Sequence, residues 1–160
     1  MTEAVKGLRI EPFAGDRDDL VELFALADDS PAAVAAYRDS GTLLIAREGA
    51  AVLGLALVVT GPQGCFAELK VLAVAEDRQG TGLGTRLVEA AVETARRAGA
   101  ALLEVSTASA DIGNLRFYQR VGFRMARIVR DAFTRETGYP DGLLIDGIPL
   151  RDQVTFDRVL

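Results

Sequence analysis

The sequence predicts a mixed α/β fold, in which a twisted sheet of about seven strands carries about four helices on its two faces. Two observations lead to this prediction. Strand-like and helix-like stretches alternate along the 160 residues, which is typical of strands connected by helices that cross the sheet. Turn residues also break two apolar runs, which is typical of antiparallel hairpins. The sequence holds no repeat and no linker, so we expect a single domain over residues 1–160.

The first part of the chain is expected to form a strand, two helices and three further strands. Acidic residues at the start of the stretch 16–29 suit the positive N-terminal end of a helix. Ser30 can cap the following helix, and Pro31 suits its first position. Glu48-Gly49 interrupts an apolar run and predicts a hairpin turn. The expected ranges are 8–13 (strand), 16–29 and 30–41 (helices), 42–61 (the two strands of the hairpin) and 65–75 (a buried strand).

The second part contains the clearest helical pattern of the chain. Leu83, Leu87, Ala91 and Ala95 recur at a spacing that puts them on one helix face. The stretch therefore reads as an amphipathic helix that packs on the sheet. The expected ranges are 84–99 (helix), 101–107 (strand), 111–122 (helix), 123–133 (strand) and 151–160 (strand).

An insertion, residues 134–150, lies between the last two strands. It is longer than a plain hairpin loop, and loops of this length are often functional. Asp146-Gly147 inside it suits a type I′ turn and predicts a small hairpin. Its apolar side chains need cover, which a homodimer contact would also provide. These side chains are Leu143, Leu144, Ile145, Ile148 and Leu150.

The composition excludes several function classes. Histidine is absent and Cys65 is the only cysteine, so His-based metal sites, zinc fingers, His-dependent triads and an internal disulfide are excluded. The formal net charge of −5 argues against a general nucleic-acid binder, which needs a basic face. No apolar run reaches the ~20 residues of a membrane span, and the first residues lack a secretion signal. We expect a cytoplasmic protein with no metal, no nucleic-acid partner and no membrane contact.

A glycine-rich stretch, residues 77–87, separates the buried strand from the amphipathic helix. A Walker loop is excluded, because Thr85 and Arg86 follow Gly84 where a lysine is needed. A dinucleotide fingerprint needs a third glycine where Thr85 stands and a first strand early in the chain. A pyrophosphate cradle fits better, because Gly82 and Gly84 leave backbone N–H groups accessible at the positive end of the helix. A tight turn that binds nothing is the structural alternative.

Two motifs and one strand resemble a known family. Residues 79–84, QGTGLG, match a Q/R-x-x-G-x-G/A signature, and residues 114–123, NLRFYQRVGF, run from an asparagine through an aromatic pair to Gly-Phe. Both features, and the apolar strand FAELKVLAV (66–74) before the loop, are similar to those of the GNAT N-acetyltransferase superfamily. The resemblance covers roughly residues 40–130. It implies a sheet that splays open at its central strand, with acetyl-CoA as cosubstrate.

The resemblance assigns the chemistry of acetyl transfer to Glu68 and Tyr118. An alkylammonium with a pKa near 10.4 must lose a proton before it can attack, and without histidine the base is a carboxylate or an ordered water. Glu68 is the candidate base, and an ion pair with Lys70 on the same face is the alternative reading. Tyr118 is the candidate acid that protonates the departing thiolate. Packing of the short helix is the alternative reading for this ring.

The resemblance also implies how the cosubstrate binds. The parted central strand would pair with the pantetheine arm like an added strand, and the Leu72 N–H would polarise the thioester oxygen. The glycine loop would surround the pyrophosphate. Arg78, Arg86 and Arg120 remain equal candidates for the adenosine-side phosphate. The expected cosubstrate-binding residues are Leu72, Ala73, Val74, Gln79, Gly80, Thr81, Gly82, Gly84, Thr85, Asn114 and Tyr118.

The acceptor is expected to be a primary amine of a small cationic substrate. The resemblance builds the acceptor cleft from the first two helices and the insertion, and the segment 11–39 is strongly acidic. The acceptor could also be a protein N-terminus or a lysine. A non-catalytic module that senses acetyl-CoA, and an interaction domain with a purely structural glycine loop, are the alternatives from other classes. The expected contacts are Asp28, Asp29, Asp131, Tyr139, Asp141 and Asp146.

Overall fold

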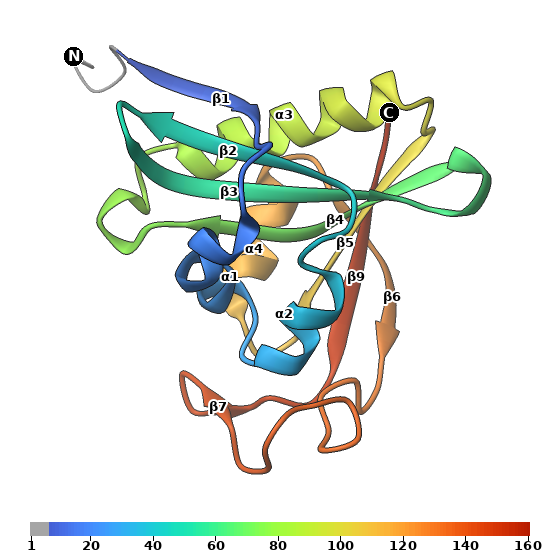
Figure 1. Ribbon diagram of the computed structural model, residues 1–160. Helices are drawn as coiled ribbons and strands as arrows, with labels where there is room; N and C mark the ends of the chain where they lie inside the picture. The colour runs from blue at the N-terminus through green and yellow to red at the C-terminus, as the bar shows by residue number, and fades with distance from the viewer. Residues whose placement is uncertain (1–6) are drawn as a thin grey trace.

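The computed structural model describes residues 7–160 and has a mixed seven-stranded sheet in the order β1-β2-β3-β4-β5-β9-β6 (Figure 1). The pairing of β4 with β5 is parallel, and the other pairings in this sheet are antiparallel. This arrangement confirms the predicted fold class. The strands are β1 (Leu8–Pro12), β2 (Thr42–Glu48), β3 (Ala51–Thr60), β4 (Phe66–Val74), β5 (Leu102–Ala108), β6 (Arg124–Val129), β7 (Leu144–Ile145), β8 (Ile148–Pro149) and β9 (Gln153–Val159).

Two of the helices, α2 and α4, begin where the sequence supplies a side-chain cap. The Ser30 hydroxyl accepts a hydrogen bond from the Ala33 N–H at 3.1 Å, and the Asp111 carboxylate accepts one from the Asn114 N–H at 2.9 Å. The expected helix 16–29 differs, because it starts as a 3-10 turn over Arg17–Leu20 before it becomes α-helical. The helices are α1 (Val21–Ala27), α2 (Pro31–Tyr37), α3 (Leu83–Arg97) and α4 (Ile112–Arg120), with further 3-10 turns at Pro62–Gly64 and Glu76–Arg78.

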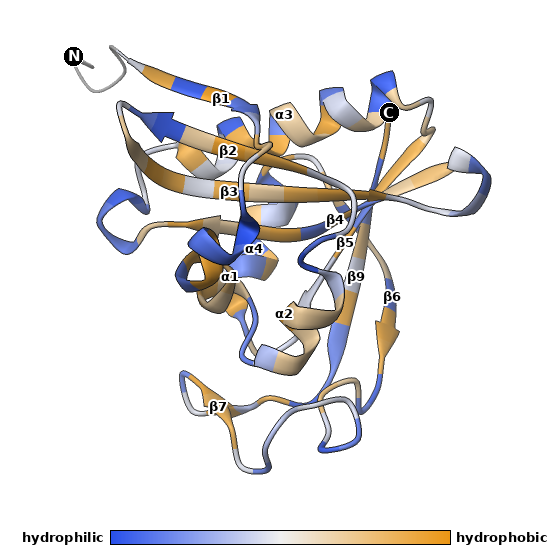
Figure 2. Cartoon of the chain, in the orientation of Figure 1, coloured by the Kyte–Doolittle hydropathy of each residue, from blue (hydrophilic) through white to orange (hydrophobic). Residues whose placement is uncertain are grey.

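Two hydrophobic clusters lie on opposite faces of the sheet. The first contains the face of α3 that the sequence predicts, with Leu87, Ala91 and Ala95 fully buried. The second joins α1 and α2 to the other face through Phe24 and Val34. In Figure 2 the hydrophobic residues follow the central strands and the helix faces turned toward them. None of the helices in residues 7–160 has the length and apolar character to cross a membrane.

The sheet parts at its centre. The register between β4 and β5 covers Phe66–Leu69 against Leu102–Val105. Beyond it β4 continues to Val74, paired on its other side with β3, while β5 continues to Ala108, paired with β9. The second halves of the two strands therefore diverge, and their facing edges are not joined by ladder hydrogen bonds.

A register shift in β4 lies at the point of divergence. Leu69 pairs with Val58 and Val71 pairs with Leu57, so Lys70 is the extra residue of a bulge. The alternation of the strand changes there. Leu69 belongs to the cluster under α3, whereas Val71 belongs to the cluster under α1 and α2.

The insertion contains the small hairpin that the sequence predicts. β7 and β8 pair through Ile145 and Ile148. Asp146 and Gly147 between them have φ values of 48° and 81°, as the two central residues of a type I′ turn require. In Figure 1 this hairpin lies below the sheet and away from α3.

Candidate active site

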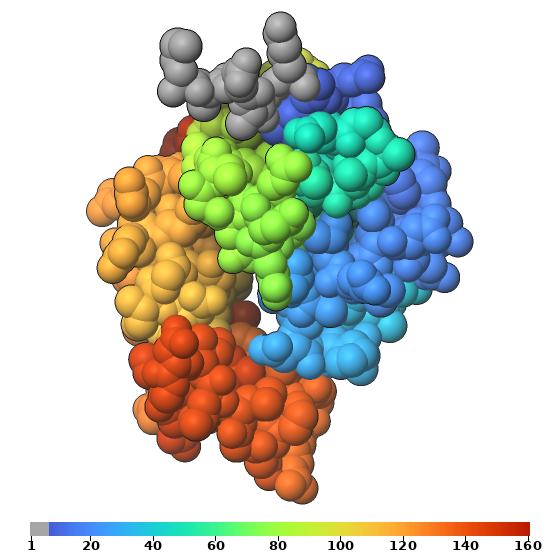
Figure 3. Space-filling view, turned by 90° about the vertical axis from the view of Figure 1, so that its left-hand side faces the viewer, coloured from blue at the N-terminus to red at the C-terminus, as the bar shows by residue number. Residues whose placement is uncertain are grey.

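A cavity of about 1120 Å³ occupies the space between the parted strands. Its lining comes from α1 and α2, from β4 and the glycine loop, from β5 and α4, and from the insertion. Figure 3 shows a hollow where these segments meet. The cavity therefore connects the parts of the chain to which the sequence assigned cosubstrate binding, chemistry and acceptor binding.

The structure brings the predicted cosubstrate residues together, with one exception. Thr81 does not line the cavity, because its hydroxyl donates to the Arg78 carbonyl at 2.6 Å and closes the turn instead. Arg78 and Arg120 line the cavity, whereas Arg86 does not. The lining includes Leu72, Ala73, Val74, Gln79, Gly80, Gly82, Gly84, Thr85, Asn114 and Tyr118.

The glycine loop has the backbone geometry of an anion cradle. Gly80 and Gly82 have φ values of 75° and 86°, and a Cβ on either would meet no atom within 4 Å. Gly82 is the N-cap of α3 and offers no side-chain cap. The first N–H groups of α3 are therefore open toward the cavity at the positive end of the helix. The Gln79 amide donates to the Val74 carbonyl at 3.1 Å and fixes the loop against the end of β4.

The other wall is fixed where α4 begins. The Asn114 amide donates to the Thr107 hydroxyl at 3.1 Å, which links α4 to the divergent half of β5. Gly84 on the opposite side lies close to α4, because a Cβ there would be 3.4 Å from the Phe117 ring. The close approach of Gly84 to Phe117 therefore holds the start of α3 next to α4.

Tyr118 lies at the junction of the cavity and the core. Its ring packs against Phe117, Phe123 and Phe156, with centroid distances of 5.1, 5.7 and 5.9 Å. Burial raises the pKa of the phenol well above its ordinary value of 10.0, and the charge of Asp111 raises it further. The hydroxyl therefore stays protonated at neutral pH, as a general acid must. The packing role expected as an alternative is also present.

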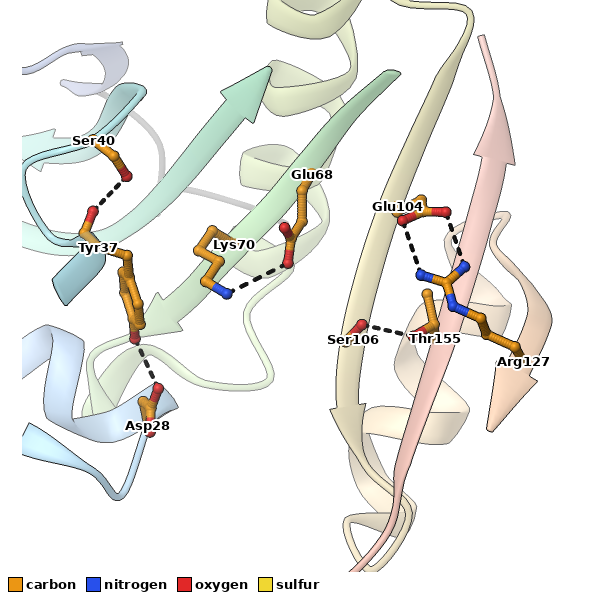
Figure 4. A network of polar contacts seen from close by, with 9 residues as sticks. All are labelled: Asp28, Tyr37, Ser40, Glu68, Lys70, Glu104, Ser106, Arg127 and Thr155. Carbon is orange, nitrogen blue, oxygen red and sulfur yellow. Dashed lines mark hydrogen bonds and ion pairs between the residues drawn. The ribbon is translucent and has the colours of Figure 1, made fainter. Parts of the chain in front are cut away.

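Glu68 is partly exposed, with its side chain 34% accessible, and it lines the cavity from β4. Its carboxylate lies 3.7 Å from the Lys70 ammonium, so the ion pair that the sequence allows is formed. The same ammonium lies 5.2 Å from the centroid of the Tyr37 ring. Figure 4 shows Tyr37, Lys70 and Glu68 side by side along one side of the parted strands.

Asp28 lies at the same end of the cavity as Tyr37 and is the centre of a hydrogen-bond cluster there. Its carboxylate accepts hydrogen bonds from the hydroxyls of Tyr37 at 3.0 Å and Tyr139 at 2.8 Å, and from the Ser30 N–H at 3.0 Å. Burial, together with the hydrogen bond and charge of Asp28, raises the pKa of both phenols above 10.0. The Tyr139–Asp28 hydrogen bond joins the insertion to the α1–α2 connection across the cavity.

The expected acceptor contacts divide into two groups. Asp28, Asp29 and Tyr139 line the cavity. Asp131 and Asp141 lie outside it and form surface ion pairs with Arg151 and Arg135 at 3.3 and 2.7 Å, and Asp146 is in the exposed hairpin turn.

Sequence reasoning gave Tyr37 no role at the site. The available signal for Tyr37 was its position as an aromatic residue at the end of a helix that begins just after Asp28 and Asp29.

Known proteins with similar sequences are acetyltransferases. The model of the acetyltransferase (GNAT) family matches residues 8–123. The uncharacterised N-acetyltransferase YvbK of Bacillus subtilis (strain 168) is 36% identical over 148 residues, which cover 92% of this chain and 93% of the relative.

Two solved structures share the whole arrangement. An acetyltransferase from Bacillus subtilis in complex with CoA superposes with a TM-score of 0.86 at 33% identity, covering 96% of this chain and 99% of that one. A GNAT family acetyltransferase from Elizabethkingia anophelis with acetyl-CoA bound superposes with a TM-score of 0.87 at 26% identity, covering 97% and 99%. The family match and these relatives thus identify the chain as an acyltransferase. The chain belongs to the acetyltransferase (GNAT) family.

Proposed function

We propose that this protein transfers an acetyl group from acetyl-CoA to the primary amine of a small cationic substrate, by direct attack of the amine on the thioester. The observation that carries the proposal is the single cavity that joins the glycine loop, the parted strands and the acidic end around Asp28. The two relatives described with CoA or acetyl-CoA support the cosubstrate.

The residues of the cavity fit acetyl-CoA, which supplies an activated acetyl group as a thioester. Gly80, Gly82 and the open N–H groups of α3 suit a pyrophosphate. The unpaired edge of β4 near Leu72–Val74 suits an extended arm with its own amide groups. The Leu72 N–H is our candidate donor to the thioester oxygen, and a donor of this kind typically contributes about 2.7–4 kcal/mol.

Proton transfer falls to two side chains from different elements. Glu68 on β4 takes the proton of the acceptor ammonium, directly or through a water. Tyr118 on α4 gives a proton to the departing sulfur, and its raised pKa keeps it in the protonated form that this step needs. Each contribution is of the usual size for acid–base assistance, about 10²–10⁴-fold.

The charges at the acceptor end favour a cation. Asp28, Asp29 and Glu68 line this end, and Lys70 is the one positive side chain that β4, α1 and α2 contribute to the described cavity lining. The aromatic faces of Tyr37 and Tyr139 add a second type of attraction for an ammonium group. A small amine with a further positive charge therefore matches the wall better than an anionic amine.

The proposal is tested by release of coenzyme A thiol from acetyl-CoA with a panel of cationic and anionic amines at equal concentration. We expect turnover that is fastest with the cationic amines and about a hundredfold slower in Tyr118→Phe, whose ring keeps the aromatic packing. Preference for anionic amines would contradict the inference that the charges of the cavity wall favour a cationic acceptor. Binding of acetyl-CoA without any thiol release would instead identify a sensing module.

A further inference from the structure

The ammonium group of Lys70 already occupies the place where the proposed function brings an amine. It lies 3.7 Å from the Glu68 carboxylate and 5.2 Å from the centroid of the Tyr37 ring. A carboxylate and an aromatic face are also the two contacts that an incoming alkylammonium would make. The chain's own lysine thus stands beside the proposed base as an acceptor would.

The position of Lys70 on the sheet supports the same reading. It is the extra residue of the β4 bulge, at the point where β4 leaves β5 and two residues before Leu72. Its side chain is 37% exposed and belongs to the cavity lining. A lysine has a flexible four-carbon stem, so its nitrogen can move along the cavity without a change of the backbone.

We propose that Lys70 is an internal acceptor, acetylated on Nζ by acetyl-CoA bound in the same cavity. This inference rests on the proposed function, because it uses the same cosubstrate and the same acid and base. It adds a modification site within the cavity and a covalent state of the enzyme.

The step balances in atoms and charge. Glu68 takes a proton from the Lys70 ammonium, and the freed lone pair forms a C–N bond to the acetyl carbonyl carbon. The C–S bond breaks, and the sulfur takes the proton of the Tyr118 hydroxyl, so that coenzyme A leaves as the thiol. The nitrogen loses its second proton as the amide forms, which restores Tyr118, and Glu68 releases its proton to solvent.

Acetylation would change the acceptor end of the cavity. The amide carries no charge, so Glu68 loses its ion-pair partner and the positive group leaves a wall that otherwise holds Asp28 and Asp29. The acetylated enzyme should therefore bind cationic acceptors more tightly than the unmodified enzyme.

The chain offers an internal control, because Lys6 and Lys70 are its two lysines. The full-length protein is incubated with acetyl-CoA and no acceptor, and is then cleaved after glutamate, which isolates Lys70 in the peptide 69–76. Tandem mass spectrometry gives the acetylation rate at each lysine. We expect Lys70 to react about a hundredfold faster than Lys6, which reports chemical acetylation, because base assistance is worth about 10²–10⁴-fold.

Two further measurements separate an active-site reaction from surface chemistry. The rate constant at Lys70 should not depend on protein concentration, since the reaction occurs within one molecule. In Glu68→Gln it should fall to the level of Lys6, measured on the longer peptide that ends at Glu76. The Lys70→Arg variant keeps the positive charge but offers no acceptor amine, so the fast acetylation of the protein by acetyl-CoA should be absent from it.

The outcomes distinguish this inference from the proposed function. Equal rates at Lys6 and Lys70, or an unmodified Lys70 in a preparation that acetylates an added amine, would overturn the inference and leave the function standing. Failure of acetyl-CoA to stabilise the protein in a thermal-shift assay would overturn the function, and the inference with it.

Discussion

At the scale of single residues, the chain places its three tyrosines in environments that oppose ionisation. Tyr37 and Tyr139 donate to the same carboxylate of Asp28, and Tyr118 is enclosed by aromatic rings. Burial is the largest cause of the raised pKa in each case. Since the fold favours the neutral phenols, they stabilise it below their ordinary pKa of 10.0, and this contribution is lost as the pH rises above 10.

This arrangement predicts the alkaline titration of the protein. The folded protein should show no phenolate absorbance step near pH 10, and ionisation should begin only at higher pH, together with unfolding. The same protein denatured in guanidinium should titrate all three phenols with a pKa of about 10. The check is near-ultraviolet absorbance recorded beside circular dichroism. A tyrosine that ionises near pH 10 while the dichroism is still native would contradict the burial assigned here.

At the scale of elements, the loop before α3 is the part whose backbone conformation matters most. Gly82 has a φ of 86° with open space around it. A side chain there would strain the backbone but would not clash with any neighbouring atom. Gly49 in the β2–β3 turn has the same character, with a φ of 60° and open space, and lies outside the cavity lining. The two positions form a matched pair.

Alanine at each position should separate stability from binding. Gly82→Ala and Gly49→Ala should each lower the free energy of unfolding by about 1–2 kcal/mol, the usual cost of a left-handed residue. Gly82→Ala alone should also weaken coenzyme A binding by about tenfold, the loss of about one hydrogen bond to an anion. Calorimetric titration with coenzyme A measures this. Equal affinities in the two variants would show that the loop does not hold the diphosphate.

The elements themselves could largely be predicted from the sequence, because their signals are local. Ser30 with Pro31, and Asp146 with Gly147, carry the cap and the turn that the structure contains. The bulge at Lys70 could not be predicted, because it depends on how β4 pairs with β3 rather than on any residue type. The expected helix 16–29 also breaks near Leu20, where a 3-10 turn precedes α1.

The candidate site was predictable only where it lies in motifs. The loop 79–84 and the segment 114–123 led to the family and, through it, to the expected cosubstrate residues, all of which except Thr81 line the cavity. Tyr37 and its contact with Lys70 were not predicted, since they depend on how α2 packs over the sheet. Thr81 was expected at the diphosphate but is not part of the cavity lining, and its hydroxyl donates to the Arg78 carbonyl instead.

At the scale of the whole molecule, the sheet has two halves, and the ladder between them consists of four residue pairs of β4 and β5. One half carries β1 to β4 with α1, α2 and α3, and the other carries β5, β9 and β6 with α4. The Tyr139–Asp28 hydrogen bond joins two residues of the cavity lining, one from the insertion and one from the α1–α2 connection. We propose that the cosubstrate fills the gap between these halves.

A crystal structure of the protein with coenzyme A tests this claim most directly. We expect the diphosphate on the N–H groups of residues 80–85, and the pantetheine arm paired with β4 beside Leu72–Val74, with its sulfur near the Tyr118 hydroxyl. Coenzyme A bound elsewhere on the surface, or a cavity filled by the protein's own side chains while coenzyme A is present at saturation, would contradict the account.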